Sequence, residues 1–215
     1  MKPNHIFLIR HGESQANVDP SVYETTPDHK IELTGLGQKQ AVQAGQRLRN
    51  IIKGKTAIYC SPFQRTRQTL EYLLAGFGSA KKQITRIRED PRLREQEWGH
   101  LRLLAEIGRI EKERHAFGTF YYRIPDGESG ADVYDRCTGV LDSLYRDFKK
   151  PGFPPNAIIV SHGLTIRLLL MRWLHWTVEE FEEKRGPENC EIFHLLLSKN
   201  GHYRLEKPFP TRTCP

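Results

Sequence analysis

Short apolar runs alternate with longer stretches of helical periodicity along the 215-residue chain. The runs typical of strands are residues 5–9, 57–61 and 156–161, with residues 83–89 as a strand or strand-like segment, and the first run is apolar throughout, as expected of a central strand. Apolar residues recur at helical spacing in residues 33–52, 62–77, 129–148 and 164–176. Thr34 is placed to cap the first of these helices, and Pro62 stands at a first-turn position of the second. Alternating strands and helices predict a three-layer α/β/α sandwich with a mostly parallel central sheet.

The remaining segments complete this organisation. Residues 17–32 form a polar loop rich in Asp, Pro and Thr, and residues 190–198 and 202–206 are typical of a hairpin around Lys-Asn-Gly. Residues 99–120 are charged and helical by pattern, and we expect them to cover one end of the sheet. Without an internal repeat or a clear linker, residues 1–215 are predicted to form a single domain.

Charge and hydropathy restrict the partners. Lys and Arg outnumber Asp and Glu by 33 to 26, which favours anions in general but is equally typical of a solvated basic surface. No compact basic block with interleaved aromatics occurs, so we expect no dedicated nucleic-acid site. The sequence contains no run of about 18 apolar residues, so no membrane span is expected. The N-terminus lacks the apolar region of a signal peptide, so a cytoplasmic protein is expected.

The four cysteines give no sign of a metal site. Cys60, Cys137, Cys190 and Cys214 are far apart and form no Cys-x-x-Cys pair. In the expected cytoplasmic setting they are interpreted as reduced structural thiols rather than as a disulfide framework.

Polar residues of a chemically useful kind follow each predicted strand. Ligands of such sheets bind beyond the carboxyl ends of the strands. The residues delivered there are Arg10, His11 and Gly12, then Ser61 and Arg65, then Glu95 and Glu97, and finally His162 and Gly163. Each alone is explained as a loop residue or as surface charge. Their coincidence at corresponding strand ends, with two strands finishing in His-Gly, favours a functional site.

The residues at these strand ends belong to four short motifs that occur together in a known family. In chain order, "LIRHGES", "SPFQRTRQT", "LREQEWG" and "IVSHG" resemble the motifs of the histidine phosphatase superfamily, also called phosphoglycerate mutase-like. The resemblance extends from residue 6 to about residue 170. The stretches "TTPDHKIELT", "GESGADVYDR" and "SHGLTIRLLLMRW" look most like plant and fungal phosphoglycerate mutase-like proteins. The resemblance to this superfamily implies the phosphoglycerate mutase-like fold, a small phosphorylated substrate, and catalysis without a metal or other cofactor.

The resemblance implies a nucleophilic role for His11, which would form a phosphohistidine. Attack on phosphorus requires a neutral imidazole, so the other ring N–H should be held by an acceptor such as a backbone carbonyl. Arg10 and Arg65 would bind the phosphoryl oxygens and disfavour the imidazolium form of His11. His162 would donate to the same oxygens as negative charge develops.

Further roles follow from the same resemblance. Gly12 and Gly163 would let the backbone approach the phosphate closely. Asn17 matches a position that contributes an amide donor, and Ser14 is a weaker candidate. Because Glu95 holds the position of the family's acid, it would protonate the leaving oxygen and then activate water.

Three neighbouring residues receive lesser roles. Glu97 lies two residues from Glu95 and is the less favoured choice for the acid. Glu128 is interpreted as ordering the loop that frames the pocket. Arg167 is interpreted as helix surface or as a residue behind the substrate contacts.

Hydrolysis is favoured over transfer between phosphorylated metabolites. The region between "REQEWG" and "PDGES" is short, and it offers no match for the lysine and paired arginines of the mutases. Their tryptophan-containing insert is also absent. Phosphoglycerate mutase-type transfer remains an alternative, as does a non-catalytic binding module with a basic surface. A homodimer is left open.

Selectivity is expected from residues 18–33 and from a cap-like segment of residues 99–126 over the site. The second of these carries five basic residues that could form a rim for a second anionic group. They are Arg102, Arg109, Lys112, Arg114 and Arg123. A solvated helix surface is the favoured interpretation of most of them.

Overall fold

A six-stranded sheet forms the centre of the computed structural model, which describes residues 2–99 and 104–212. The strands are β1 (His5–Arg10), β2 (Thr56–Cys60), β3 (Ile84–Glu89), β4 (Asn156–Ser161), β5 (Ile192–Leu197) and β6 (Tyr203–Leu205). Their order in the sheet is β3-β2-β4-β1-β5-β6. The first four run parallel, and β5 and β6 form the expected antiparallel pair at one edge.

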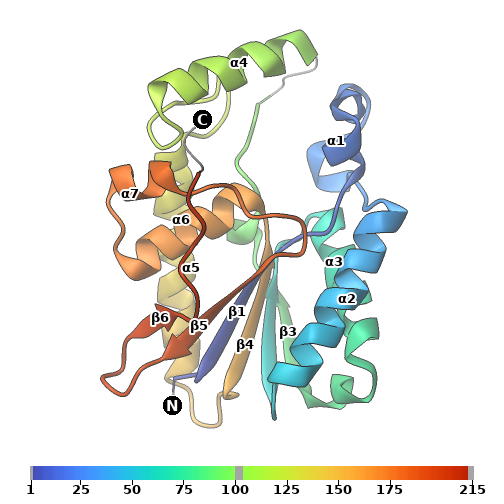
Figure 1. Cartoon of the computed structure of the whole chain (residues 1–215), viewed down its shortest axis with the longest axis vertical. Helices are drawn as coiled ribbons and strands as arrows, with labels where there is room; N and C mark the ends of the chain where they lie inside the picture. The colour runs from blue at the N-terminus through green and yellow to red at the C-terminus, as the bar shows by residue number, and fades with distance from the viewer. Residues whose placement is uncertain (1, 100–103, 213–215) are drawn as a thin grey trace.

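Helices cover both faces of this sheet (Figure 1). The α-helices are α1 (Gln15–Val18), α2 (Gly35–Ile51), α3 (Gln64–Phe77), α4 (Leu104–Phe117), α5 (Gly130–Phe148), α6 (Gly163–Leu174) and α7 (Val178–Glu183). Helices α2 and α3 lie on one face, and α5 and α6 lie on the other. Among the described helices, none combines the length and apolar character that a membrane crossing requires.

Strand β1 shows why the sheet needs cover on both faces. Ile6 and Leu8 pack into the core cluster that contains α5 and α6, whereas Phe7 and Ile9 pack into the cluster that contains α2 and α3. All four side chains are fully buried. Because successive side chains of a strand point to opposite faces, a continuous apolar run is buried only between two layers of helices. The predicted three-layer sandwich is therefore confirmed.

The register of the parallel strands sets the geometry of the site. Arg10 of β1 pairs with Ser161 of β4, and the backbone N–H of His11 donates to the Ser161 carbonyl at 3.0 Å. The residues that follow the two strands, His11 and His162, are therefore neighbours at the carboxyl edge of the sheet. In Figure 1, α1 and α4 lie beyond this edge.

Several local expectations were wrong. Helix α3 begins at Gln64 with Phe63 as its N-cap, so Pro62 precedes the helix instead of occupying its first turn. The loop of residues 17–32 contains short helical turns at Pro20–Glu24 and Asp28–Lys30. Helix α7 was not anticipated, although its capping box is visible in the sequence as Thr177 followed three residues later by Glu180.

The described cysteines are structural in character. Cys60, Cys137 and Cys190 are buried and free, and burial raises the pKa of each thiol to about 12. A neutral thiol is a poor nucleophile, so these side chains act as small apolar groups in the core. Cys214 lies outside the described residues.

Candidate active site

A pocket of about 1190 Å³ opens at the carboxyl edge of the sheet. Nine residues were predicted to act in catalysis or phosphate binding, and seven of them line it: Arg10, His11, Ser14, Asn17, Arg65, Glu95 and Gly163. Gly12 and His162 are not among its lining residues. The pocket is large enough for a small organic molecule rather than for an isolated inorganic ion.

His11 is held in a neutral form with one ring nitrogen free. Its Nδ1–H donates to the carbonyl oxygen of Gly12 at 2.7 Å, which leaves the Nε2 lone pair available. The side chain is only 4% exposed. Burial, followed by the Arg65 and Arg10 cations, lowers the pKa of His11 well below its usual value. The neutral imidazole with a backbone-held N–H therefore has the form that a nitrogen nucleophile requires.

His162 is fully buried beside His11, with the two ring centroids 5.2 Å apart. Its Nε2 and the Ser61 hydroxyl are hydrogen-bonded at 2.8 Å, whereas Nδ1 has no partner among the described residues. Burial, with Arg65 as the next cause, lowers the pKa of His162 well below its usual value. If Ser61 donates to Nε2, then Nδ1 carries the proton and is a buried donor without an acceptor. Ser61 was noted at its strand end but was not assigned this supporting contact.

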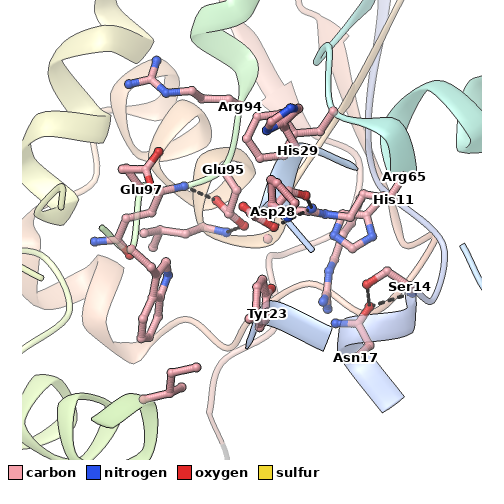
Figure 2. A pocket seen from close by; sticks show the side chains of 18 of the residues that line it. His11, Ser14, Asn17, Tyr23, Asp28, His29, Arg65, Arg94, Glu95 and Glu97 are labelled. Atoms are coloured by element: carbon pink, nitrogen blue, oxygen red, sulfur yellow. Dashed lines mark hydrogen bonds and ion pairs between the residues drawn. The ribbon is translucent and has the colours of Figure 1, made fainter. Parts of the chain in front are cut away.

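Arg10 and Arg65 are both near enough to lower the pKa of His11, and they differ in their partners. Arg10 donates through Nη1 to the Pro187 carbonyl at 2.6 Å, and its buried Nε has no partner among the described residues. Arg65 is 4% exposed and donates through Nη1 to the backbone carbonyl and the carboxylate of Asp28, both at 2.7 Å. Figure 2 shows this contact as dashed lines.

The pairing of Arg65 with Asp28 was not anticipated. Asp28 belongs to the loop that the sequence assigned to selectivity, and its side chain is 34% exposed. Tyr23 and His29 of the same loop also line the pocket. Helical periodicity and strand ends carry no information about which side chains of a loop point inward, so these contacts could not be read from the sequence.

Glu95 lies across the N-terminus of α6. Its carboxylate accepts hydrogen bonds from the backbone N–H groups of Leu164 and Thr165, both at 3.2 Å, and from the Thr165 hydroxyl at 3.0 Å. These donors fix the position of the Glu95 carboxylate at the start of α6. Glu97 is exposed on the pocket rim (Figure 2).

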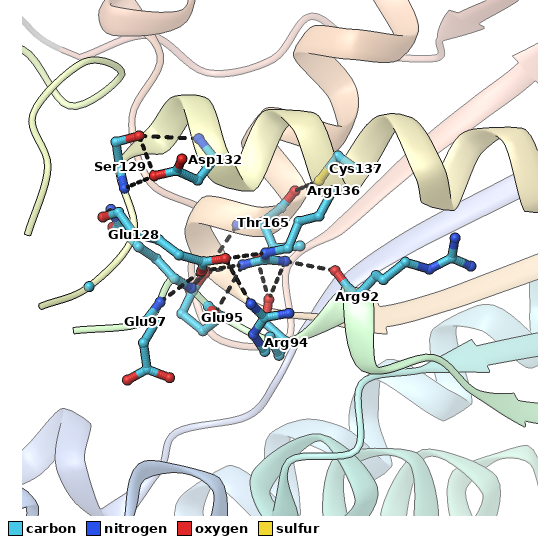
Figure 3. A network of polar contacts seen from close by, with 12 residues as sticks. Arg92, Arg94, Glu95, Glu97, Glu128, Ser129, Asp132, Arg136, Cys137 and Thr165 are labelled. Carbon is cyan, nitrogen blue, oxygen red and sulfur yellow. Dashed lines mark hydrogen bonds and ion pairs between the residues drawn. The ribbon is translucent and has the colours of Figure 1, made fainter. Parts of the chain in front are cut away.

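A half-buried ionic network holds the segment that carries Glu95 (Figure 3). Arg136 donates to the backbone carbonyls of Arg92, Arg94 and Glu95 at 2.7, 2.9 and 3.1 Å. Its guanidinium also pairs with Glu128 at 2.9 Å, and Glu128 accepts from Arg94 at 2.8 Å. Glu128 further accepts from the backbone N–H of Glu97 at 2.9 Å. These contacts agree with the ordering role assigned to Glu128.

Gly12 is required for a reason other than phosphate access. A Cβ atom on Gly12 would lie 2.5 Å from the Gly37 carbonyl oxygen of α2, well inside contact distance. The Gly12 N–H donates to the Thr69 hydroxyl at 3.0 Å and is thus already engaged. Gly163 does line the pocket, and a Cβ there would lie 3.7 Å from Arg10 and 3.8 Å from Glu95.

Ser14 and Asn17 form one unit at the start of α1. The backbone N–H and hydroxyl of Ser14 donate to the Asn17 side-chain oxygen at 3.0 and 3.1 Å. Asn189 donates to the same oxygen at 3.2 Å. These bonds engage the Asn17 oxygen and leave its amide nitrogen as a donor toward the pocket. Ser14 is 2% exposed, so its contribution is to orient Asn17.

The basic residues of the cap-like segment separate into two groups. Arg109 and Arg123 are exposed and form ion pairs with Glu113 and Asp132. Lys112 is exposed, and Arg102 lies outside the described residues.

Arg114 differs from the solvated surface favoured for this group, because it is half-buried and lines the pocket. Arg167 also lines the pocket and is 5% exposed, so its interpretation as helix surface was wrong. Helical periodicity assigned both side chains without taking account of the neighbouring elements that cover them.

Comparison with known proteins identifies the family. The sequence profile of the histidine phosphatase superfamily (branch 1) matches residues 6–207. The chain belongs to this superfamily. The predicted resemblance is therefore confirmed over nearly the whole chain.

Relatives of this histidine phosphatase carry two kinds of name. The phosphoglycerate mutase-like protein AT74 of Arabidopsis thaliana is 42% identical, with 94% of this chain and 68% of the relative covered. The broad-range acid phosphatase DET1 of Saccharomyces cerevisiae is 27% identical, with 99% and 91% covered. The structure of a mycobacterial glucosyl-3-phosphoglycerate phosphatase superposes with a TM-score of 0.73 at 23% identity, covering 97% and 100% of the two chains. At that identity the structural match demonstrates the shared fold.

Proposed function

We propose that this member of the histidine phosphatase superfamily hydrolyses a phosphomonoester through a phosphohistidine on His11. The observation that carries the proposal is the state of His11: a buried neutral imidazole near two arginines, held at Nδ1 by a backbone carbonyl, with Nε2 unbonded within the described part of the chain. A family member with a phosphatase name, the yeast acid phosphatase, supports the same reaction class.

In the proposed first step, Nε2 of His11 attacks phosphorus, and the bond between phosphorus and the ester oxygen breaks. Glu95 transfers its proton to that oxygen, so the alcohol leaves in neutral form. Arg10, Arg65 and the Nδ1–H of His162 would stabilise the charge on the phosphoryl oxygens.

In the second step, Glu95 accepts a proton from water, and the hydroxyl oxygen attacks phosphorus. The bond between phosphorus and nitrogen breaks, which returns the electron pair to Nε2 and releases inorganic phosphate. The guanidinium groups of Arg10 and Arg65 supply the positive charge that metal ions provide at other phosphoryl-transfer sites, and the neutral His162 ring adds a hydrogen-bond donor. The proposal therefore requires no metal or other cofactor.

We further propose that residues 99–126 act as a cap over the site. Ile107, Glu111 and Arg114 of α4 line the pocket together with Trp98 and Gly99. One helix on a short segment leaves room for water, which supports hydrolysis over return of the phosphoryl group to a bound metabolite.

Hydrolysis is tested by following both products. The protein is incubated with 3-phosphoglycerate in one reaction and with p-nitrophenyl phosphate in another, with and without added 2,3-bisphosphoglycerate and a chelator. We expect inorganic phosphate to be released in equal amount to the alcohol, without dependence on either addition. Formation of 2-phosphoglycerate in preference to free phosphate would identify a mutase instead.

The contact between Asp28 and Arg65 predicts competition with phosphate. A phosphoryl group bound by Arg65 would meet the Asp28 carboxylate, and two anions at one guanidinium repel each other. Asp28→Asn keeps the size and one acceptor but removes the charge. We expect inorganic phosphate to inhibit this variant with a roughly fivefold lower Ki, or about 1 kcal/mol. Weaker inhibition by phosphate would mean that Asp28 orients Arg65 for the substrate.

A further inference from the structure

Two arginines that line the pocket have no use in the proposed reaction. Arg114 comes from α4 and Arg167 from α6, and both line the pocket. The buried Nε atom of each has no hydrogen-bond partner among the described residues. Buried polar atoms are almost always hydrogen-bonded, so unpartnered donors on a pocket wall point to a ligand.

The two guanidinium groups are held in place without being neutralised. Arg114 stacks over Trp98 at 5.5 Å, and Arg167 stacks over Phe181 at 4.2 Å. Arg167 also donates through Nη2 to the Phe181 carbonyl at 2.8 Å. Neither forms an ion pair within residues 2–99 and 104–212. Cations fixed by stacking are pre-organised to receive an anion.

The charged groups near Arg114 and Arg167 do not neutralise these two arginines. Arg212 adds a third cation, and together with the dominant effect of burial it lowers the pKa of Arg167 to about 10. Three carboxylates are near: Glu95, Glu111 and Glu182. Glu95 is engaged by the N-terminus of α6, Glu111 is exposed, and Glu182 accepts from the Phe120 N–H at 2.7 Å. An incoming anion would find two charged donors at once.

The position of Glu95 indicates which part of the substrate would carry that anion. Glu95 interacts electrostatically with Arg10 beside the nucleophile and also with Arg114 and Arg167. The Glu95 carboxylate is therefore near Arg10 and also near Arg114 and Arg167. In the proposed reaction Glu95 protonates the leaving oxygen, so the group bound by Arg114 and Arg167 belongs to the departing alcohol.

We propose that Arg114 and Arg167 bind a second anionic group on the leaving alcohol. The preferred substrates are then phosphomonoesters whose alcohol also carries a carboxylate or a second phosphate. This inference rests on the proposed phosphatase function and specifies its substrate class. A carboxylate and a phosphate each present two oxygens that can accept paired hydrogen bonds from one guanidinium group. The second anion would add binding energy remote from the reacting phosphorus.

The test uses two matched substrate series. One consists of ω-phosphooxy carboxylates with three to eight carbons, and the other consists of the corresponding ω-phosphooxy alcohols, which lack only the terminal charge. The quantity measured is the ratio of kcat/KM between carboxylate and alcohol at each chain length. A ratio cancels losses of active protein or of general catalytic power in a variant. The variants are Arg114→Gln, Arg167→Gln, Arg167→Lys and, as a control, Arg109→Gln on the exposed face of α4.

For the wild type we expect a ratio of at least about 10 at one or two chain lengths, which would report the spacing of the two sites. Arg114→Gln and Arg167→Gln should bring the ratio close to 1, Arg167→Lys should retain part of it, and Arg109→Gln should leave it unchanged. A wild-type ratio near 1 at every length would overturn the inference and leave the phosphatase function intact. Absence of hydrolysis in both series would overturn the proposed function and this inference with it.

Discussion

Replacement of His11 by alanine is expected to lower phosphatase turnover by about 10⁴-fold or more, which corresponds to roughly 5.5 kcal/mol of lost transition-state stabilisation. Removal of the imidazole leaves the charged groups of the pocket but no atom on which the phosphoryl group can reside. Wild-type protein quenched in alkali after exposure to a labelled phosphomonoester should carry base-stable, acid-labile phosphate on His11. His115→Ala, an exposed position on α4, is the matched control.

The pKa shift of His11 adds a second measurement to this prediction. A pKa below the usual 6.5 means that the neutral, nucleophilic ring persists as the pH falls through that value. In an NMR titration, the His11 ring should remain neutral as the pH falls through 6.5. Unlabelled wild-type protein, together with a His11→Ala variant of undiminished turnover, would exclude the phosphohistidine mechanism.

The part of the site that sequence alone predicted is the part fixed by strand ends. Arg10 ends β1, and His11 and His162 follow β1 and β4 directly, so the parallel pairing of these strands leaves little freedom in where they lie. Arg65 lies in the first turn of α3, whose start is fixed by the end of β2. Continuous apolar runs in the central strands and 3.6-residue periodicity in the helices are local properties, so the layers followed from them.

The parts that were missed depend on contacts between segments that are distant in sequence. Asp28 reaches Arg65 across a loop whose short turns are set by its own hydrogen bonds and by packing on α3. The burial of Arg167 depends on α7, an element that was not anticipated. Gly12 is a third case: the sequence singled out the residue, but glycine is required there by close packing against α2 rather than by access to phosphate. No periodicity encodes such contacts.

Replacement of Glu95 by glutamine is expected to separate the two chemical steps. Glutamine cannot protonate a leaving oxygen or accept a proton from water, so turnover of an alkyl phosphate should fall by roughly 10²–10⁴-fold. p-Nitrophenol leaves without protonation, so this ester should still phosphorylate His11 in the variant. Dephosphorylation would remain slow because water activation needs the carboxylate. The phosphoenzyme should therefore accumulate, with a burst of nitrophenol equal to the amount of active protein.

The matched control for this prediction is Glu97→Gln, two residues away on the exposed rim of the pocket. It should turn over both esters close to the wild-type rate and show no burst. The comparison is informative because the structure separates the two carboxylates by environment: Glu95 is held by Leu164 and Thr165 at the start of α6. A burst in the Glu97 variant, with normal turnover in the Glu95 variant, would reassign the general acid. Equal losses of turnover for the alkyl and nitrophenyl esters, without accumulation of phosphoenzyme, would instead indicate that Glu95 positions the N-terminus of α6. A purely structural defect would lower turnover of both esters regardless of the leaving group.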